Sequence, residues 1–276
     1  MRAFSPWLVL LMFASPARAD DQSAEFEEHT FAWHGGAKMP YRLLKPAKVE
    51  AGKKYPLVLI LHGWGERGSD NNKQLKDFGP AFLKPGVRKR FPCFVLLPQA
   101  NGSWVENPVF DKPIGLTKKP TANLAMAHEI LKAVVKKHPV DADRLYLMGY
   151  SNGACGVWEL LEREPHVWAA AAPMAGAGDP SHVGPAKKVA IWAFHGEKDP
   201  TIPLDRMREL VAALRAAHGH PMFTIYPKGV HHHAKDGLHD PNLLRWMFAQ
   251  RRGQPEVPFE EVAKPTDKRP TSLVKK

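Results

Sequence analysis

The stretch LYLMGYSNG at residues 145–153 is the strongest indication of the fold of this chain. Its first four residues form an apolar run typical of a buried strand, and a helical pattern follows at residues 154–161. Between them, Gly149 and Gly153 flank Ser151 in a Gly-x-Ser-x-Gly pattern, which places a serine on a sharp turn from strand to helix. Such a turn strains the serine backbone and packs the strand closely against the helix, so its neighbours must be small. The stretch therefore predicts a nucleophilic Ser151 at a strand end.

Further strands and helices are expected on both sides of this turn. Three apolar runs are continuous rather than alternating, which is typical of strands buried on both faces: residues 57–61, 94–97 and 189–194. An antiparallel pair is expected to lead in at residues 30–33 and 41–44. Helical patterns occupy residues 121–137, 206–217 and 242–251. Alternation of these segments predicts an α/β fold with a mostly parallel central sheet flanked by helices.

Composition supports a single globular domain. The chain has 276 residues, 44% of them hydrophobic, and two cysteines. A disordered chain would carry fewer large apolar residues, and a disulfide-stapled mini-protein would be shorter and richer in cysteine. Because α/β folds commonly reach about 250 residues as one unit, we expect one domain at residues 20–253. Beyond it, residues 254–276 are rich in Pro and Lys and predict a flexible tail.

The first nineteen residues have the pattern of a secretory signal peptide. Arg2 precedes an apolar stretch at residues 7–14, and Ala17-Arg18-Ala19 then fits the small-x-small cleavage pattern, with the cut before Asp20. The stretch is shorter than the about 20 apolar residues that span a bilayer, so we expect no stable membrane insertion. The alternative is an N-terminal anchor that is not removed. Cleavage predicts a secreted or periplasmic protein.

The formal net charge of +11 raises the question of an anionic partner. Lysines and arginines are spread along the chain without a long basic run, so nucleic acid is not expected to bind. The sequence makes no prediction about the oligomeric state.

A serine hydroxyl needs a histidine base and a carboxylate that orients it. In this type of fold the acid follows the serine in the chain and the histidine comes last. Asp199 follows the strand predicted at residues 189–194, and its competitors are Asp179 and Asp205. His231, His232 and His233 are all candidates for the base, because they follow the apolar segment at residues 222–226.

The same histidines raise the alternative of a metal site. His231, His233, His239 and Asp240 are donor types at short range. No pair among them has the His-x-x-x-His spacing that places two ligands on one helix face, so neither a metal nor another cofactor is expected.

Acyl transfer also requires donors for a developing oxyanion. The N–H of the residue after the nucleophile, Asn152, supplies one, and the loop after the strand at residues 57–61 offers the N–H of Trp64. We interpret His62 in that loop as a buried histidine that holds the turn.

The chain resembles the secreted α/β-hydrolase esterases related to feruloyl esterases, polyhydroxybutyrate depolymerases and dienelactone hydrolases. These proteins are often labelled prolyl-oligopeptidase-like or phospholipase/carboxylesterase. The resemblance covers residues 31–252, and the residues that carry it are 55–68, 98–99 with Trp104, 143–153, 192–199 and 243–246.

The resemblance implies an α/β-hydrolase fold without a cap domain, Ser151 as nucleophile, Asp199 as acid, and the Trp64 and Asn152 N–H groups as oxyanion hole. The family pattern Gly-Val-x-His aligns with residues 229–232 and makes His232 the base. Gln99 and Trp104 are expected to contact substrate.

Three departures from the family pattern concern the acyl pocket. Trp64 stands where a small residue is common, Asn152 where an apolar residue is common, and Ala234-Lys235 where an aromatic follows the base. We expect Glu66, Arg67 and Asp70 to hold the oxyanion loop by ion pairing.

The resulting hypothesis is a serine carboxylic ester hydrolase that acts through an acyl-enzyme without a cofactor. An open site would suit a small-molecule ester or a bulky, polymer-borne ester such as an acylated polysaccharide. The alternatives are a serine peptidase, because the same triad cleaves amides, and a catalytically inactive binding protein.

Overall fold

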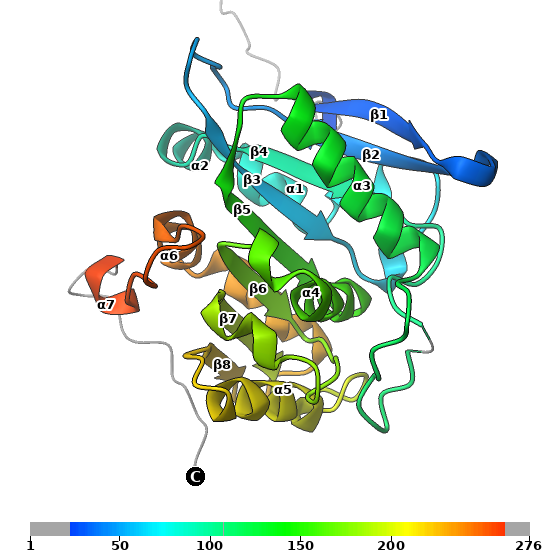
Figure 1. Ribbon diagram of the computed structural model, residues 1–276, viewed down its shortest axis with the longest axis vertical. Coiled ribbons are helices and arrows are strands. Elements are labelled where there is room, and N and C mark those ends of the chain that lie inside the picture. Colours follow the sequence, from blue (N-terminus) through cyan, green and yellow to red (C-terminus); the bar gives the residue numbers. More distant parts are fainter. Residues whose placement is uncertain (1–22, 107, 263–276) are drawn as a thin grey trace, which may run out of the picture.

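The computed structural model describes residues 23–106 and 108–262, which form one twisted sheet with helices on both faces (Figure 1). The strands are β1 (Phe26–Ala32), β2 (Lys38–Leu44), β3 (Tyr55–Leu61), β4 (Phe94–Pro98), β5 (Val140–Tyr150), β6 (Ala170–Met174), β7 (Ala190–Gly196) and β8 (Met222–Tyr226). The helices are α1 (Gly79–Leu83), α2 (Pro85–Arg90), α3 (Ala122–Lys137), α4 (Asn152–Arg163), α5 (Leu204–Ala216), α6 (Leu243–Ala249) and α7 (Phe259–Val262). None of them is long and apolar enough to cross a membrane.

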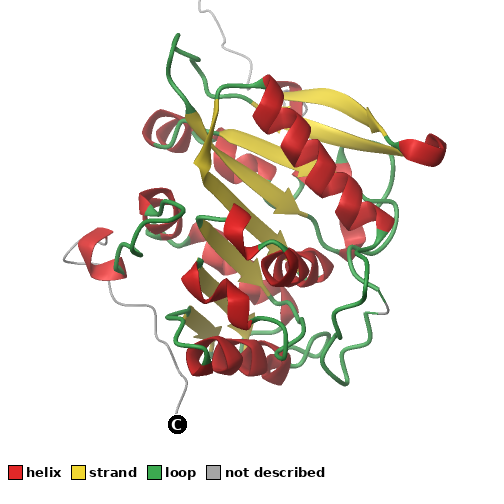
Figure 2. Cartoon of the chain, in the orientation of Figure 1, coloured by secondary structure: helices red, strands yellow, loops and turns green. Residues whose placement is uncertain are grey.

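The strand order is β1-β2-β4-β3-β5-β6-β7-β8. From β4 to β8 every neighbouring pair is parallel, whereas β1 pairs with β2 and β2 with β4 in antiparallel fashion. This is the mostly parallel sheet that the sequence predicted, and loops of different lengths connect its strands to the helices (Figure 2). Because the strands are parallel, their carboxyl ends lie at one edge of the sheet.

Each central strand contributes to two hydrophobic cores. In β3, Leu57, Leu59 and Leu61 belong to the core beneath α3, α4 and α5, and Val58 and Ile60 belong to the core on the other face. All seven residues of β3 are buried. Burial on both faces explains why this strand is a continuous apolar run rather than an alternating one.

One central strand escaped the sequence analysis. β6 reads AAAPM, and alanine and proline are both depleted in strands, since alanine offers little surface to pack and proline cannot donate a ladder hydrogen bond. The strand nevertheless lies between β5 and β7 and is fully buried. Just after the strand, α4 packs closely on the chain, because a Cβ on Gly176 would lie 2.7 Å from the Cβ of Ala154. Within the strand, Ala171 belongs to the core beneath α4, whereas Ala170 and Ala172 belong to the core on the other face.

The boundary predicted at residue 254 is wrong for part of the expected tail. The Gln250 side chain donates to the carbonyl of Val257 at 2.9 Å and accepts from its N–H at 2.9 Å. Phe259 in α7 is buried and meets the Trp192 ring edge-on, with 5.5 Å between centroids. Packing against the core thus continues to Val262. The expected signal peptide at residues 1–19 and residues 263–276 lie outside the described residues.

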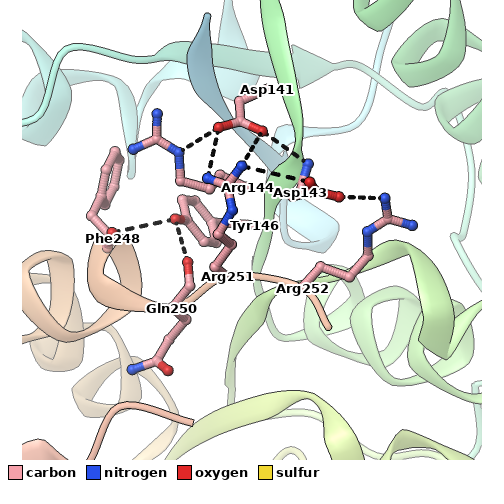
Figure 3. Close-up of polar contacts among 8 residues, drawn as sticks. All are labelled: Asp141, Asp143, Arg144, Tyr146, Phe248, Gln250, Arg251 and Arg252. Carbon is pink, nitrogen blue, oxygen red and sulfur yellow. Dashed lines mark hydrogen bonds and ion pairs between the residues drawn. The ribbon is translucent and has the colours of Figure 1, made fainter. Parts of the chain in front are cut away.

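A charged cluster joins the start of β5 to the chain after α6 (Figure 3). The Asp141 carboxylate accepts from Arg144 at 2.9 Å and from Arg251 at 3.0 Å, and Arg252 lies 2.6 Å from Asp143. Burial raises the pKa of Asp141, but hydrogen bonds from the Asp143 N–H, Arg144 and Arg251 outweigh it and hold the pKa below its usual range. The cluster therefore fastens the C-terminal part of the domain to the sheet.

We expect Asp141→Ala to lower the free energy of unfolding by about 1–2 kcal/mol, because two arginines lose a shared carboxylate. The matched control is Asp205→Ala, which breaks an exposed pair with Arg208 and should cost less than about 0.5 kcal/mol. Urea unfolding at pH 7 measures both. Because the pKa of Asp141 is lowered in the folded state, its contribution is present at neutral pH and is lost as the pH falls below about 4. An equal decrease in the free energy of unfolding in Asp141→Ala and Asp205→Ala would contradict a stabilising role for the charged cluster.

Candidate active site

Ser151 occupies the turn between β5 and α4 in a backbone conformation that L-residues rarely adopt, with φ 55° and ψ −122°. Close packing imposes this geometry. A Cβ on Gly153 would lie 2.0 Å from the carbonyl oxygen of Leu61, and one on Gly149 would lie 2.6 Å from the carbonyl oxygen of Gly153. The Ser151 N–H donates to the carbonyl of Met174 at 2.9 Å, which ties the strained turn to β6. Both glycines of the motif are thus required by contact distances.

Three side chains from separate loops meet at the carboxyl edge of the sheet. The Nε2 atom of His231 lies 2.8 Å from Ser151 Oγ, and its Nδ1 atom lies 2.7 Å from Asp199 Oδ2. Ser151 follows β5, Asp199 follows β7 and His231 follows β8. Because an ionised carboxylate only accepts hydrogen bonds, Nδ1 carries the proton and Nε2 is left to accept the Ser151 hydroxyl proton. This geometry is suited to activating a serine nucleophile.

The Asp199 carboxylate is buried and well supplied with donors. Its Oδ1 accepts the N–H groups of Thr201 at 2.8 Å and Ile202 at 3.0 Å. Burial raises the pKa of Asp199, but hydrogen bonds from His195, His231 and the Ile202 N–H outweigh it and hold the pKa well below its usual range. The group is therefore ionised at neutral pH.

The two competing acids lie elsewhere. Asp179 accepts from the Ser181 hydroxyl at 2.6 Å within its own loop, and from the N–H of Leu116 in the loop between β4 and α3 at 2.9 Å. Asp205 is in the first turn of α5 and pairs with Arg208 at 2.9 Å. Neither of them contacts the His231 ring.

The structure corrects the histidine predicted as base: His231, and not His232, lies between Ser151 and Asp199. The carbonyl of Gly229 accepts from the Lys198 N–H at 2.7 Å, which holds the chain against the loop after β7. A 3₁₀ helix at His231–His239 begins immediately afterwards, so its first residue faces Asp199. His232 is exposed and stacks on His233, with 4.2 Å between ring centroids.

His233 has a local role instead. Its Nδ1 accepts the N–H of Val230 at 3.1 Å and so caps the start of the 3₁₀ helix. Among the residues that the structure describes, no group of three or more histidine, cysteine, aspartate or glutamate side chains could hold a metal ion. The four donors considered at residues 231, 233, 239 and 240 accordingly do not converge in the described structure.

His62 joins the two loops that border the nucleophile. Its Nδ1 donates to the carbonyl of Gly63 at 2.7 Å, and its Nε2 accepts the N–H of Ala100 at 2.9 Å. The indole N–H of Trp104 donates to the carbonyl of His62 at 2.9 Å. Burial lowers the pKa of His62 to about 4, so the ring is neutral near pH 7. These contacts fit the role of a buried loop histidine.

Asn152 fastens the same region through its side chain. Its Oδ1 accepts the N–H of Trp104 at 3.0 Å, and its Nδ2 donates to the Ser103 hydroxyl at 2.9 Å. The amide therefore holds the loop after β4 against the start of α4, which accounts for a polar residue at a buried position. Its own backbone N–H lies in the first turn of α4, where N–H groups have no intrahelical partner.

The two residues expected to contact substrate are buried instead. Trp104 is 0% exposed and Gln99 is 1% exposed. The Gln99 amide donates to the carbonyl of Glu66 at 3.1 Å and accepts the N–H of Asn71 at 2.6 Å. Both side chains hold the loops that form the site, and neither presents a surface to a ligand. This part of the family pattern, residues 98–99 with Trp104, therefore stabilises the site loops.

Ion pairing was expected to hold the loop at residues 66–70, and the structure supports this only in part. Asp70 pairs with Lys73 at 3.2 Å and accepts from the Gln99 amide. Arg67 forms no ion pair within the described residues and stacks on Trp64.

The sequence analysis gave no role to Tyr150, the residue before the nucleophile. Its ring packs against the His231 imidazole, with 5.0 Å between centroids. Lys235 lies 4.8 Å from the centroid of the Tyr150 ring and pairs with Asp77 at 2.8 Å. The lysine thus contacts the aromatic ring that packs on the imidazole. In the sequence, the only feature that pointed to this contact was that Lys235 departs from the aromatic residue of the family pattern.

Comparison with known proteins identifies the fold and the family. A model of the phospholipase/carboxylesterase family matches residues 46–242, which is more than half of the chain. A thermostable esterase of known structure is 32% identical, with a TM-score of 0.76 over 84% of this chain and 64% of that chain. A feruloyl esterase module from Clostridium thermocellum, complexed with sinapinate, has a TM-score of 0.61 at 15% identity over 82% of this chain and 88% of that one, which shows the fold alone.

The esterase-like protein NocK of Nocardia uniformis subsp. tsuyamanensis is 25% identical over 173 residues, which is 62% of this chain and 48% of NocK. The chain therefore spans about half the length of this relative and 64% of the thermostable esterase. The sheet topology and the family match lead to the same conclusion: the fold is that of an α/β-hydrolase, and the chain belongs to the phospholipase/carboxylesterase family.

Proposed function

We propose that this protein is a carboxylic ester hydrolase in which Ser151, His231 and Asp199 form the catalytic triad. The observation that carries the proposal is the unbroken pair of short contacts, 2.8 Å from Ser151 Oγ to Nε2 and 2.7 Å from Nδ1 to Asp199. A serine held in a strained turn, with a histidine and a buried carboxylate in line, is the arrangement required for acyl transfer.

The reaction follows from the positions of these atoms. Ser151 Oγ attacks the ester carbonyl carbon while His231 Nε2 takes the hydroxyl proton, and the Asp199 carboxylate stabilises the imidazolium. The tetrahedral intermediate then expels the alcohol, which receives that proton, and an acyl-serine remains. A water molecule then attacks the acyl carbon while His231 Nε2 takes its proton. The second tetrahedral intermediate releases the carboxylic acid, and Ser151 Oγ regains the proton.

The proposed oxyanion donors are the backbone N–H groups of Trp64 and Asn152. Two features support them. Asn152 is the first residue of α4, and Trp64 begins a 3₁₀ turn directly after Gly63, in the loop that His62 holds. Fixed donors at the site of developing charge are worth about 10²–10³ in rate each.

Two finer parts of the hypothesis are proposals of the same kind. The signal pattern at residues 1–19 supports export, and sequencing the N-terminus of the mature protein would test a cut before Asp20. Only residues 175–189 connect β6 to β7, which supports an open site for bulky or polymer-borne esters.

Activity on matched p-nitrophenyl esters and anilides distinguishes esterase from peptidase. Failure of a fluorophosphonate to label Ser151 would favour an inactive binding protein.

The assignment of the base is tested by two neighbouring histidines. His231→Ala should lower kcat on a p-nitrophenyl ester by about 10⁴-fold or more, because the serine loses its proton acceptor. His232→Ala is the matched control, since this side chain is exposed and contacts His233 rather than Ser151. It should keep nearly full activity. A large loss in the control together with an active His231→Ala variant would overturn the proposed triad.

His62 gives a prediction about acid stability. Its folded-state pKa of about 4 is below that of the unfolded chain, about 6.5, so between these values the unfolded state binds a proton that the folded state excludes. Stability should therefore fall by about 3 kcal/mol through this residue as the pH drops from 6.5 to 4. The His62→Gln variant should have a lower free energy of unfolding than the wild type at pH 7, but this free energy should decrease less as the pH falls to 4.

The measurement is urea unfolding at several pH values between 4 and 7. His128 and His138 also have pKa values lowered chiefly by burial, and both remain in the variant, so the comparison isolates His62. His166→Gln is the control, because His166 is 74% exposed at the side chain. An unchanged pH dependence in His62→Gln would show that this ring is not the buried neutral group described above.

A further inference from the structure

The indole of Trp64 is exposed at the edge of the site. Trp64 is 47% exposed, which is unusual among the large apolar residues described. The preceding residue, Gly63, packs on the elbow, because a Cβ there would lie 3.1 Å from the Tyr150 ring. Tyr150 is next to Ser151 and contacts His231. An exposed aromatic surface in this position is well placed to contact a ligand.

Arg67 covers this indole. The centre of its guanidinium lies 3.4 Å from the ring centroid, and its Nε donates to the carbonyl of Trp64 at 2.7 Å. The stacking and the hydrogen bond together fix the plane of the guanidinium, which reduces the rotamer entropy that binding would otherwise remove. The loop thus presents a rigid cation three residues after a proposed oxyanion donor.

This cation has no carboxylate partner among the residues that the structure describes. The neighbouring acids are engaged differently. Asp70 accepts from the Gln99 amide and pairs with Lys73, and Glu66 is buried, which raises its pKa. The two terminal nitrogens of Arg67 carry four N–H donors in the planar arrangement that matches a carboxylate. The geometry therefore leaves a planar anion-recognition group at the rim.

We propose that Arg67, supported on Trp64, binds a carboxylate of the substrate, so that the preferred esters carry a negative charge on the acyl or alcohol part. This inference rests on the proposed esterase function and adds the substrate class. The excess of Lys and Arg over Asp and Glu, 39 against 28, also favours the approach of anionic substrates. Acidic polysaccharide esters and monoesters of dicarboxylic acids share the required chemistry.

A purely structural role for Arg67 makes a different prediction. If its only task were to hold the Trp64 carbonyl, its replacement would weaken turnover of every ester by the same factor. Charge recognition alters the ratio between esters of different charge. The informative quantity is therefore the ratio of kcat/KM values and not the rate on any one substrate.

The experiment compares three p-nitrophenyl esters of similar length: hexanoate, which is neutral, the adipate monoester, which is anionic, and 6-trimethylammoniohexanoate, which is cationic. Spontaneous hydrolysis is subtracted for each. The wild-type protein should prefer the adipate ester to the hexanoate ester by about tenfold at low salt, and added salt should reduce this preference. Arg67→Gln should bring the ratio to about one, and Arg67→Glu should favour the cationic ester.

Arg208→Gln is the matched control, because it removes the same charge from the exposed face of α5. It should retain the wild-type ratio. Hydrolysis of the hexanoate ester with an adipate ratio that Arg67→Gln leaves unchanged would overturn this inference while the esterase function stands. Absence of hydrolysis of all three esters would overturn the proposed function.

A second measurement keeps the inference independent of turnover. Calorimetry with the Ser151→Ala protein should show that it binds the anionic monomethyl adipate more tightly than the neutral methyl hexanoate. Combining Ser151→Ala with Arg67→Gln should abolish the difference. Equal binding of the two esters by Ser151→Ala would overturn the anion site.

Discussion

The close approach of α4 to the end of β3 is the constraint on which the rest of the site depends. Gly153 lies so near the carbonyl of Leu61 that no side chain fits between them. Because the helix starts this close to the sheet, the preceding residue must turn sharply, and Ser151 is held at positive φ. The same contact brings the first N–H groups of α4 beside the loop after β3. The strain at the serine is therefore set by packing that the two hydrophobic cores maintain.

Buried polar groups fix the loops around this turn. His62, Gln99 and Asn152 are nearly inaccessible to solvent, and each has its hydrogen-bonding atoms satisfied by backbone groups or neighbouring side chains. An unsatisfied buried donor or acceptor would cost about 1–3 kcal/mol, so these contacts have to form together. The bordering loops are consequently rigid. Such rigidity is what a proposed oxyanion site requires, because donors that reorganise during the reaction contribute less.

The charges near Ser151 fall into two groups with different surroundings. Asp199 is buried, ionised and surrounded by donors, and its Oδ2 lies 2.7 Å from Nδ1 of the His231 imidazole. Arg67 is partly exposed and packs on an aromatic face, so its charge is available at the surface. The first arrangement orients a proton acceptor, and the second is suited to selecting a substrate. Both lie on loops at the carboxyl edge of the sheet, and the sheet itself contributes the rigid support.

The sequence by itself determined the elements whose signal is local. Continuous apolar runs identified β3, β4, β5 and β7, because a strand buried on both faces cannot alternate. The elbow was recognisable from its glycine spacing, and the position of Asp199 followed from the chain order of the motifs. Only the tertiary structure decided features that depend on contacts between distant segments. β6 forms from alanines between β5 and β7, where every residue of the strand is buried, and Phe259 packs against the ring of the distant Trp192. Likewise, His231 rather than His232 contacts Ser151 and Asp199 because of how the last loop turns beside the loop after β7, where the Lys198 N–H donates to the carbonyl of Gly229. No pattern within the three histidines encodes that register.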